Sequence, residues 1–229
     1  MGRMFRLWKN SRIETVNPFN GCEYACYGGN CWAARMAKRL QGAGVKGYKN
    51  GFEPSWCPWR MEVPETDIVW IGGMGDIAFQ STENIREVIE KMIEPNPGTL
   101  FFLETKNPAT YNRFIDDLPK NVIISATIES NRPHNVTDAP APLERFLSFK
   151  DLDWSRKHVS VEPVMKFDLR TMLDWMSGID PEIVSIGYDN YNCGLSEPPR
   201  GLTKHLIREL KTFTDVEEKT IRGWNPESR

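Results

Sequence analysis

The sequence predicts an α/β fold, in which parallel strands form a partial (β/α)6 barrel within a single domain spanning residues 1–229. Short apolar runs of buried-strand length alternate six times with segments of helical period. The connections between them are short, as expected for right-handed crossovers between parallel strands. The chain has 229 residues, 40% of them hydrophobic, which is enough for one substantial core. Six units are too few for the closed eight-unit barrel, so we expect an open one.

The first unit is expected to carry a long loop between its strand and its helix. Residues 12–17 form a short extended segment that leads into a cysteine-containing loop at 17–33. A helix is predicted over 32–41, where small and apolar residues recur at spacings of three and four and Gly42 provides a stop. Residues 42–66, rich in Gly, Pro and Trp, are expected to form a loop.

The remaining five units repeat one pattern, in which an apolar run of four to seven residues precedes an amphipathic segment. The expected strands are 67–73, 99–103, 122–127, 158–162 and 183–187. The segments expected to follow them on the outside of the sheet are 82–94, 108–117, 142–148, 168–177 and 202–213. A last segment, 216–221, is expected to add an edge strand.

Three cysteines dominate the loop at 17–33. Cys22, Cys26 and Cys31 are spaced C-x3-C-x4-C, and glycines between and before them let the backbone turn tightly. Three sulfurs from such a loop can converge on one point. This pattern indicates a metal site.

The cysteines alone do not identify the metal. A structural zinc needs a fourth ligand, whereas a [4Fe-4S] cluster on three thiolates leaves one iron free to bind a cofactor or substrate. Unliganded thiols are the third interpretation. Disulfides are disfavoured, because the five cysteines are an odd number and no signal peptide is evident, so we expect a reducing, cytoplasmic location. The possible fourth zinc ligands are Cys57, Cys193, His134, His158 and His205.

Charge is distributed unevenly along the chain. The net charge is −2, but residues 1–52 carry nine cations against two carboxylates, which leaves a net −9 on the rest. A cationic rim near the cysteines would attract an anionic substrate such as a nucleic acid or a phosphorylated metabolite. A solvated helix face explains the same charges. No apolar run has the length of a membrane span, so no membrane association is expected.

Chemistry in a parallel barrel lies at the carboxyl ends of its strands, and polar or glycine residues stand at these positions here. The glycines let a ligand approach the backbone, although a tight turn explains them equally well. A buried carboxylate at a strand end requires either an ion pair or a ligand. The candidate binding residues are Gly72, Gly73, Met74, Asp76, Thr105, Lys106, Ser125, Thr127, Glu129 and Glu162.

The cysteine loop resembles a known cluster loop. The run Asn17-Pro18-Phe19-Asn20-Gly21-Cys22, followed by Cys26 and by Cys31-Trp32-Ala33, is similar to that of radical S-adenosylmethionine (SAM) enzymes, in the branch of spore photoproduct lyase and the phage Gp37/Gp68-like (DUF5131) proteins. The familiar spacing is C-x3-C-x2-C, so this chain has two extra residues between its second and third cysteines.

The resemblance implies a radical SAM core and an enzyme. A [4Fe-4S] cluster on the three cysteines would chelate SAM and cleave it reductively to a 5'-deoxyadenosyl radical, with a reductant such as flavodoxin or ferredoxin supplying the electron. It also implies that the glycines at 72 and 73 meet the methionine amino group, with Asp76 as an acceptor, and that Lys106 lies near the SAM carboxylate. Ser125 and Thr127 would then contact the ribose or the carboxylate, and Glu129 would contact a ribose hydroxyl.

Two residues near the last strand are candidates for catalysis. Tyr188 and Cys193 have side chains that can return a hydrogen atom to a substrate radical, although a small residue in a loop is the simpler explanation for Cys193. Two other classes stay open: a zinc-stabilised nucleic-acid-binding module without catalysis, and an electron carrier, which normally uses four cysteines. The substrate is not indicated, and a monomer is expected.

Overall fold

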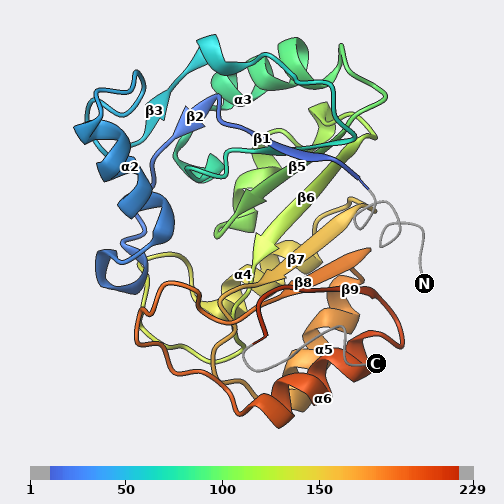
Figure 1. The fold of residues 1–229 in the computed structure, drawn as a ribbon. Helices are drawn as coiled ribbons and strands as arrows, with labels where there is room; N and C mark the ends of the chain where they lie inside the picture. Colours follow the sequence, from blue (N-terminus) through green and yellow to red (C-terminus); the bar gives the residue numbers. More distant parts are fainter. Residues whose placement is uncertain (1–10, 222–229) are drawn as a thin grey trace.

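The computed structural model describes residues 11–221. Its centre is a seven-stranded sheet in which every neighbouring pair of strands is parallel. Strand order follows chain order, so the sheet curls into a half-barrel without a strand reversal (Figure 1). The strands are β1 (Ile13–Val16), β4 (Ile68–Ile71), β5 (Leu100–Thr105), β6 (Val122–Thr127), β7 (Lys157–Val161), β8 (Ile183–Ile186) and β9 (Asp215–Glu218). The predicted partial barrel of parallel strands is confirmed.

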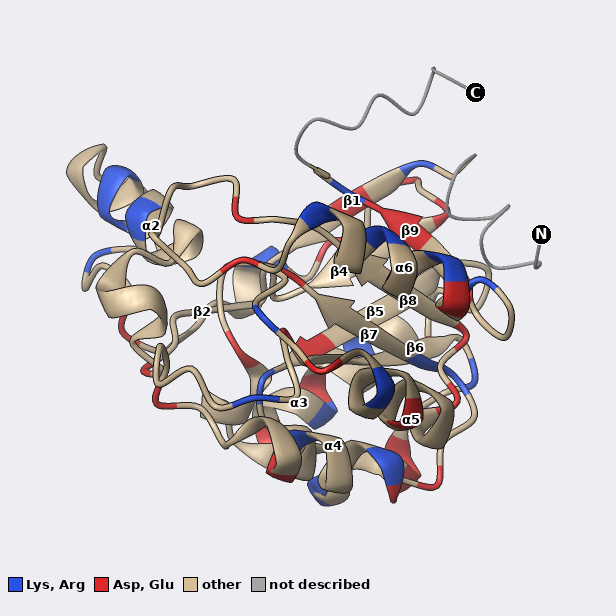
Figure 2. Ribbon diagram, turned by 90° about the horizontal axis from the view of Figure 1, so that it is seen from below, with Lys and Arg blue, Asp and Glu red and all other residues tan. Residues whose placement is uncertain are grey.

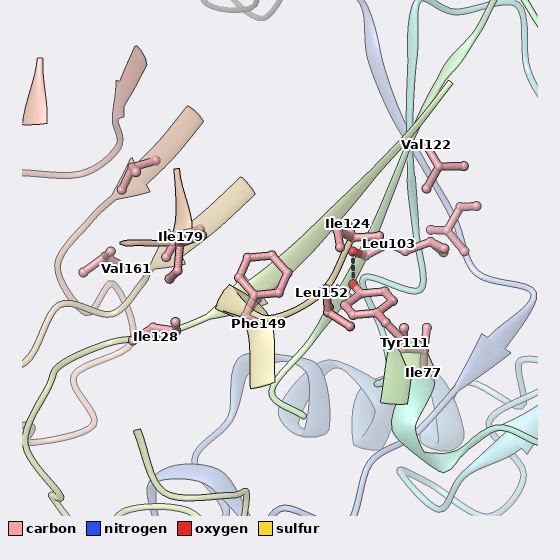
Figure 3. Packing of buried hydrophobic residues seen from close by; sticks show 14 of the residues in the cluster. Ile77, Leu103, Tyr111, Val122, Ile124, Ile128, Phe149, Leu152, Val161 and Ile179 are labelled. Atoms are coloured by element: carbon pink, nitrogen blue, oxygen red, sulfur yellow. Dashed lines mark hydrogen bonds between the residues drawn. The ribbon is translucent and has the colours of Figure 1, made fainter. Parts of the chain in front are cut away.

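Helices cover the convex face of this sheet. They are α3 (Thr82–Val88), α4 (Pro142–Lys150), α5 (Leu169–Ile179) and α6 (Arg200–Leu210). Because side chains alternate along a strand, every second residue points toward these helices and forms the main core. Figure 3 shows this packing, with Leu103 and Ile124 of the sheet against Tyr111, whose hydroxyl donates to the carbonyl oxygen of Leu103 at 2.6 Å.

The concave face carries the other half of each strand. The part of this face nearer the amino ends of the strands is apolar and is formed by Ile68, Phe102, Ile123 and Ile183. His158 of β7 pairs in register with Ile183, is fully buried, and has its ring roughly perpendicular to the rings of Trp70 and Phe102.

Hydroxyl groups flank this histidine on both sides. The Nδ1 atom of His158 lies 2.7 Å from Ser125 Oγ, and Nε2 lies 2.9 Å from Ser185 Oγ. Burial lowers the pKa of His158 to about 3, so the ring is neutral and its two hydrogen bonds satisfy both nitrogens. The concave face therefore changes from apolar to polar toward the carboxyl ends of the strands.

A small excursion separates β1 from β4. Strands β2 (Phe19–Asn20) and β3 (Ser55–Trp56) pair antiparallel, and α2 (Trp32–Gly42) lies between them in the sequence. The buried face of α2 packs Ala33 and Ala37 against Tyr48 and Met74. In Figure 1 this unit lies at one side of the half-barrel, away from α5 and α6.

Two expected helices differ in form. The segment expected at 82–94 is α-helical only to Val88 and continues as a π-helix over Ile89–Ile93. The segment expected at 108–117 forms two 3-10 helices, Pro108–Arg113 and Ile115–Asp117. The segment 216–221, expected at the sheet edge, contains most of β9, which is the last strand of the sheet. Within the described residues, no helix combines the length and apolarity that a membrane crossing requires.

Candidate functional site

A cavity of about 690 Å³ opens at the carboxyl ends of the strands. The cysteine loop and the first turn of α2 line one side of it, and the ends of β4 to β9 line the other. Parallel half-barrels carry their chemistry at this end. The predicted site residues that line the cavity are Cys22, Cys26, Cys31, Gly72, Gly73, Asp76, Thr105, Lys106, Thr127 and Glu162.

The start of the cysteine loop is fixed to the end of β4. The side-chain oxygen of Asn17 accepts from the Met74 N–H at 2.9 Å, and Gly21 forms an isolated parallel bridge with Gly75. On the other side, the Cys22 N–H donates to the Phe52 carbonyl at 3.1 Å. Strand β4 and the loop after α2 therefore both hold the first cysteine.

Two glycines permit this close approach. A side chain at Gly21, whose φ is +86°, would place its Cβ 2.3 Å from the Glu53 carbonyl oxygen. A Cβ at Gly72, with φ +75°, would lie 2.2 Å from the Phe19 ring. The tight-turn interpretation of Gly72 is therefore sufficient to explain why it is glycine, although the residue also lines the cavity.

The middle of the loop is held by the segment before α4. The Tyr24 carbonyl accepts from the Asp138 N–H at 2.8 Å and from the Thr137 hydroxyl at 3.1 Å. Thr137 Oγ1 also lies 3.2 Å from Cys26 Sγ. Tyr27 adopts a left-handed backbone conformation with φ 59°, which turns the chain between the second and third cysteines.

The three cysteines open onto the same cavity, yet they are not drawn together. Cys26 is buried, and Cys22 and Cys31 are partly exposed. Within residues 11–221, no three His, Cys, Asp or Glu side chains are arranged to hold a metal ion. Burial raises the pKa of Cys22, and the negative charge of Asp76 and of the other two cysteines adds to this rise. A cation at this point would reverse these effects.

Asp76 organises the end of β5. Its carboxylate accepts from the Thr105 hydroxyl at 2.6 Å, from the Lys106 N–H at 2.8 Å and from the Ala78 N–H at 2.9 Å. Burial raises the pKa of Asp76, and these three donors oppose the rise. The carboxylate is thus engaged within the protein and sets the position of Thr105 and Lys106.

A buried ion cluster lies beside it. Glu129 pairs with Lys106 through Oε1 and with Arg145 through Oε2, the latter at 2.6 Å. Tyr27 donates its hydroxyl to Glu129 Oε1 at 3.1 Å, which links the cluster to the cysteine loop. Burial lowers the pKa of Lys106 to about 8. Sequence reasoning missed Arg145, because a single arginine in a helical segment has no pattern that shows it points inward.

Two carboxylates lie on the concave face of the sheet. Glu104 accepts from the Thr127 hydroxyl at 3.0 Å, and burial raises the pKa of both Glu104 and Glu162, in the latter case to about 7. The charge of Lys219, just beyond β9, opposes the rise at Glu162. Glu104 and Lys219 were not among the sequence-based candidates, although the position of Glu104 at a strand end was a usable signal.

Five of the candidates lie away from the cavity lining. Met74 packs into the apolar cluster under α2. Ser125 lies further from the carboxyl end of β6 than Thr127 does, and its hydroxyl contacts the His158 ring. Glu129 is enclosed by its two cations. The Tyr188 hydroxyl lies 2.7 Å from Thr203 Oγ1 on α6, so it points to the helix layer. Cys193 lies on a loop with its Sγ 3.6 Å from the Asn30 carbonyl, close to the third cysteine but outside the lining.

The possible fourth zinc ligands are also engaged elsewhere. Cys57 is fully buried and lies 3.2 Å from the Asn20 side-chain nitrogen. His134 contacts the Lys166 carbonyl, and His205 pairs with Glu209 on α6. His158 lies within the concave face. None of these four lines the cavity with the three cysteines.

The model of the DUF5131 family, described as "Protein of unknown function", matches residues 8–181, most of the chain. The chain belongs to the DUF5131 family. This agrees with the branch that the cysteine loop resembles. A search of curated proteins found no match.

Solved structures share the fold of this DUF5131 protein. Spore photoproduct lyase in complex with dinucleoside spore photoproduct matches with a TM-score of 0.60 at 9% identity, over 87% of this chain and 74% of the other. A double mutant of that enzyme with bound AdoMet and dinucleoside spore photoproduct matches with a TM-score of 0.55 at 10% identity, over 87% and 61%. At this identity the likeness shows a common half-barrel fold.

Proposed function

We propose that this DUF5131 protein is a radical SAM enzyme, with a [4Fe-4S] cluster held by Cys22, Cys26 and Cys31. The observation that supports it most directly is that all three cysteines open onto one cavity together with the ends of β4, β5 and β7. The proposal is also supported by the half-barrel fold shared with spore photoproduct lyase, a radical SAM enzyme, because such folds carry their chemistry at the carboxyl ends of the strands.

The donor set fits this cofactor better than a single ion. Three thiols from one loop are the ligands of a cluster with an open iron, and none of Cys57, His134, His158 and His205 lines the cavity with them. The three cysteines would hold the cluster at the rim of the cavity that they share.

When bound, the cluster and SAM supply a 5'-deoxyadenosyl radical after one-electron reduction by a flavodoxin or ferredoxin. The chain's own residues would bind and orient SAM. The backbone of Gly72 and Gly73 offers carbonyl groups to the SAM ammonium, and Lys106 offers its ammonium to the carboxylate of SAM. Asp76 holds Lys106 through the main chain, so its proposed role is to position rather than to contact SAM.

Glu129 and Arg145 help to fix the position of this cation. Glu129 holds the Lys106 ammonium in place before a ligand arrives, and Arg145 balances Glu129 from the opposite side. Glu162 and Thr127 offer acceptors to hydroxyl or amino groups of the ligand. Cys193 remains a candidate for returning a hydrogen atom, since it lies at the Cys31 end of the loop, whereas the hydroxyl of Tyr188 points away.

The test is reductive cleavage of SAM. Reconstituted protein reduced with dithionite without oxygen should release methionine and 5'-deoxyadenosine in equal amounts, measured by liquid chromatography. Alanine at any one of the three loop cysteines should abolish release, whereas Cys57→Ala should retain it, because Cys57 is buried away from the cavity. Release that persists in the Cys26→Ala protein would refute the proposal.

A further inference from the structure

The surface around α2 is the most cationic part of the described chain. Residues 24–60 hold six cations and one carboxylate. In Figure 2, α2 stands at one end of the molecule with its Lys and Arg positions in blue. The six are Arg35, Lys38, Arg39, Lys46, Lys49 and Arg60, and here they are called the α2 basic surface.

These six cations lack carboxylate partners. None of them forms an ion pair with a described residue, whereas elsewhere cations pair regularly, as in Arg86 with Asp117 and Arg156 with Glu182. Arg35 and Arg39 lie four residues apart on the exposed side of α2, a like-charge spacing that destabilises a helix. Such an arrangement favours the binding of an external anion.

Exposed aromatic rings are interleaved with these cations. Trp32 is 42% exposed, opens α2 and also lines the cavity. Tyr191 is 49% exposed, and its carbonyl accepts from the Arg35 guanidinium at 3.3 Å. Trp59 is 49% exposed beneath the Lys46 ammonium, which lies 4.0 Å from its ring centre. Exposed rings beside cations that have no carboxylate partner are a feature of surfaces that bind single-stranded nucleic acid.

We propose that the α2 basic surface binds single-stranded nucleic acid and leads one of its bases to the cavity. This inference rests on the proposed function and names the substrate class of that site. Phosphates would meet the cations, and bases would stack on Trp32 and Tyr191 at the cavity rim. The 11-residue helix spans about 16 Å, which suits several nucleotides and exceeds the reach of one small phosphorylated metabolite.

An acidic electron-donor protein is the main competitor for the same surface. Such a protein would also bind a positively charged surface near the cysteine loop, but electrostatic attraction alone would be enough for its binding. The exposed rings favour nucleic acid, because base stacking uses their faces and an electrostatic docking site does not need them. Loss of Trp32 should therefore weaken the binding of nucleic acid but not the binding of an acidic protein.

The experiment measures fluorescence anisotropy of a fluorescein-labelled 12-nucleotide DNA strand of mixed sequence. Wild-type protein should bind with a Kd tighter than about 100 μM at 0.1 M salt. The variant R35Q/K38Q/R39Q should lower the magnitude of the log K against log salt slope by about 2, because three phosphate contacts are lost. The matched control R200Q/K204Q/R208Q, which removes the same charge from α6, should leave the slope unchanged.

Trp32→Ala should weaken binding about fivefold or more, since one stacked base is lost. Circular dichroism confirms that each variant is folded. The inference is overturned by absence of binding at 100 μM, by an equal effect of the α6 control, or by displacement with polyphosphate together with an unchanged Trp32→Ala affinity. Binding of flavodoxin but not DNA, dependent on the α2 cations, also overturns it.

The outcome is independent of the radical chemistry. The measurement needs no cluster, so a C22A/C26A/C31A protein should still bind the strand. Protein that binds DNA but does not cleave SAM would refute the proposed function alone. Protein that cleaves SAM but does not bind DNA would refute this inference alone.

Discussion

The buried cluster around Glu129 gives the sharpest stability prediction. Glu129 is 2% exposed and Arg145 is 1% exposed, and they form a direct ion pair at 2.6 Å. Glu129→Gln keeps the size of the side chain but removes the charge that two cations share. Because breaking a buried pair leaves an uncompensated charge, we expect the free energy of unfolding to fall by about 3 to 5 kcal/mol.

The two cations contribute unequally to this loss. Lys106 can release its proton, since its pKa is already lowered to about 8, whereas arginine stays charged. The cost therefore comes mainly from Arg145. The double variant E129Q/R145M should regain part of the lost stability, so the double-mutant cycle should show strong coupling between the two positions.

Urea unfolding followed by circular dichroism measures these differences, with Glu87→Gln as the control. Glu87 pairs with Lys91 on the surface, and its loss should cost no more than about 0.5 kcal/mol. Thermal unfolding should show a Tm decrease of roughly 10 °C for Glu129→Gln. An E129Q protein as stable as E87Q would refute the account of this cluster.

Three further results are expected. Gly21→Ala should destabilise the protein by at least ~2 kcal/mol more than Gly44→Ala in thermal unfolding, because both have positive φ but only at Gly21 does the Cβ meet backbone, at 2.3 Å. For Glu162, burial raises the folded-state pKa to about 7 from the ordinary 4.5, so the folded protein binds the proton more tightly than the unfolded chain does. The stability of the wild type relative to Glu162→Gln should therefore fall by about 3 kcal/mol as the pH rises from 4.5 to 7. An equal difference in urea midpoints at the two pH values would contradict this. Lys106→Met should weaken SAM binding at least about tenfold in equilibrium dialysis of the reconstituted protein while its secondary structure is retained, since a charged contact to the carboxylate is lost.

The centre of the sheet was predictable because β4, β5 and β6 each contain a compact apolar run, whereas the edge strands β1 and β9 contain fewer apolar residues. The run at 122–127 was expected as a strand and is β6 with the same bounds. The expected helix at 108–117 was wrong in type, since Pro108 and the short span to β6 favour tighter 3-10 turns over a full α-helix.

The side-chain partners at the site were less predictable. Strand ends and the cysteine spacing indicated where the cavity lies, and ten candidates line it. Ser125 was assigned to a ligand, but its partner His158 comes from the next strand, 33 residues later. Likewise, Glu129 forms ion pairs with Lys106 and Arg145. Such pairings depend on strand register and helix orientation, which periodicity does not encode.

The most direct test of the proposed function is the metal content and EPR spectrum of protein purified without oxygen. The account predicts about four irons and four sulfides per chain, and a reduced-state EPR signal that changes when SAM is added. Cys193→Ala should keep the irons, and Cys22→Ala should lose the SAM-dependent signal. Stoichiometric zinc, or a reconstituted cluster whose spectrum ignores SAM, would contradict the account and leave the cysteine loop as a structural or electron-transfer site.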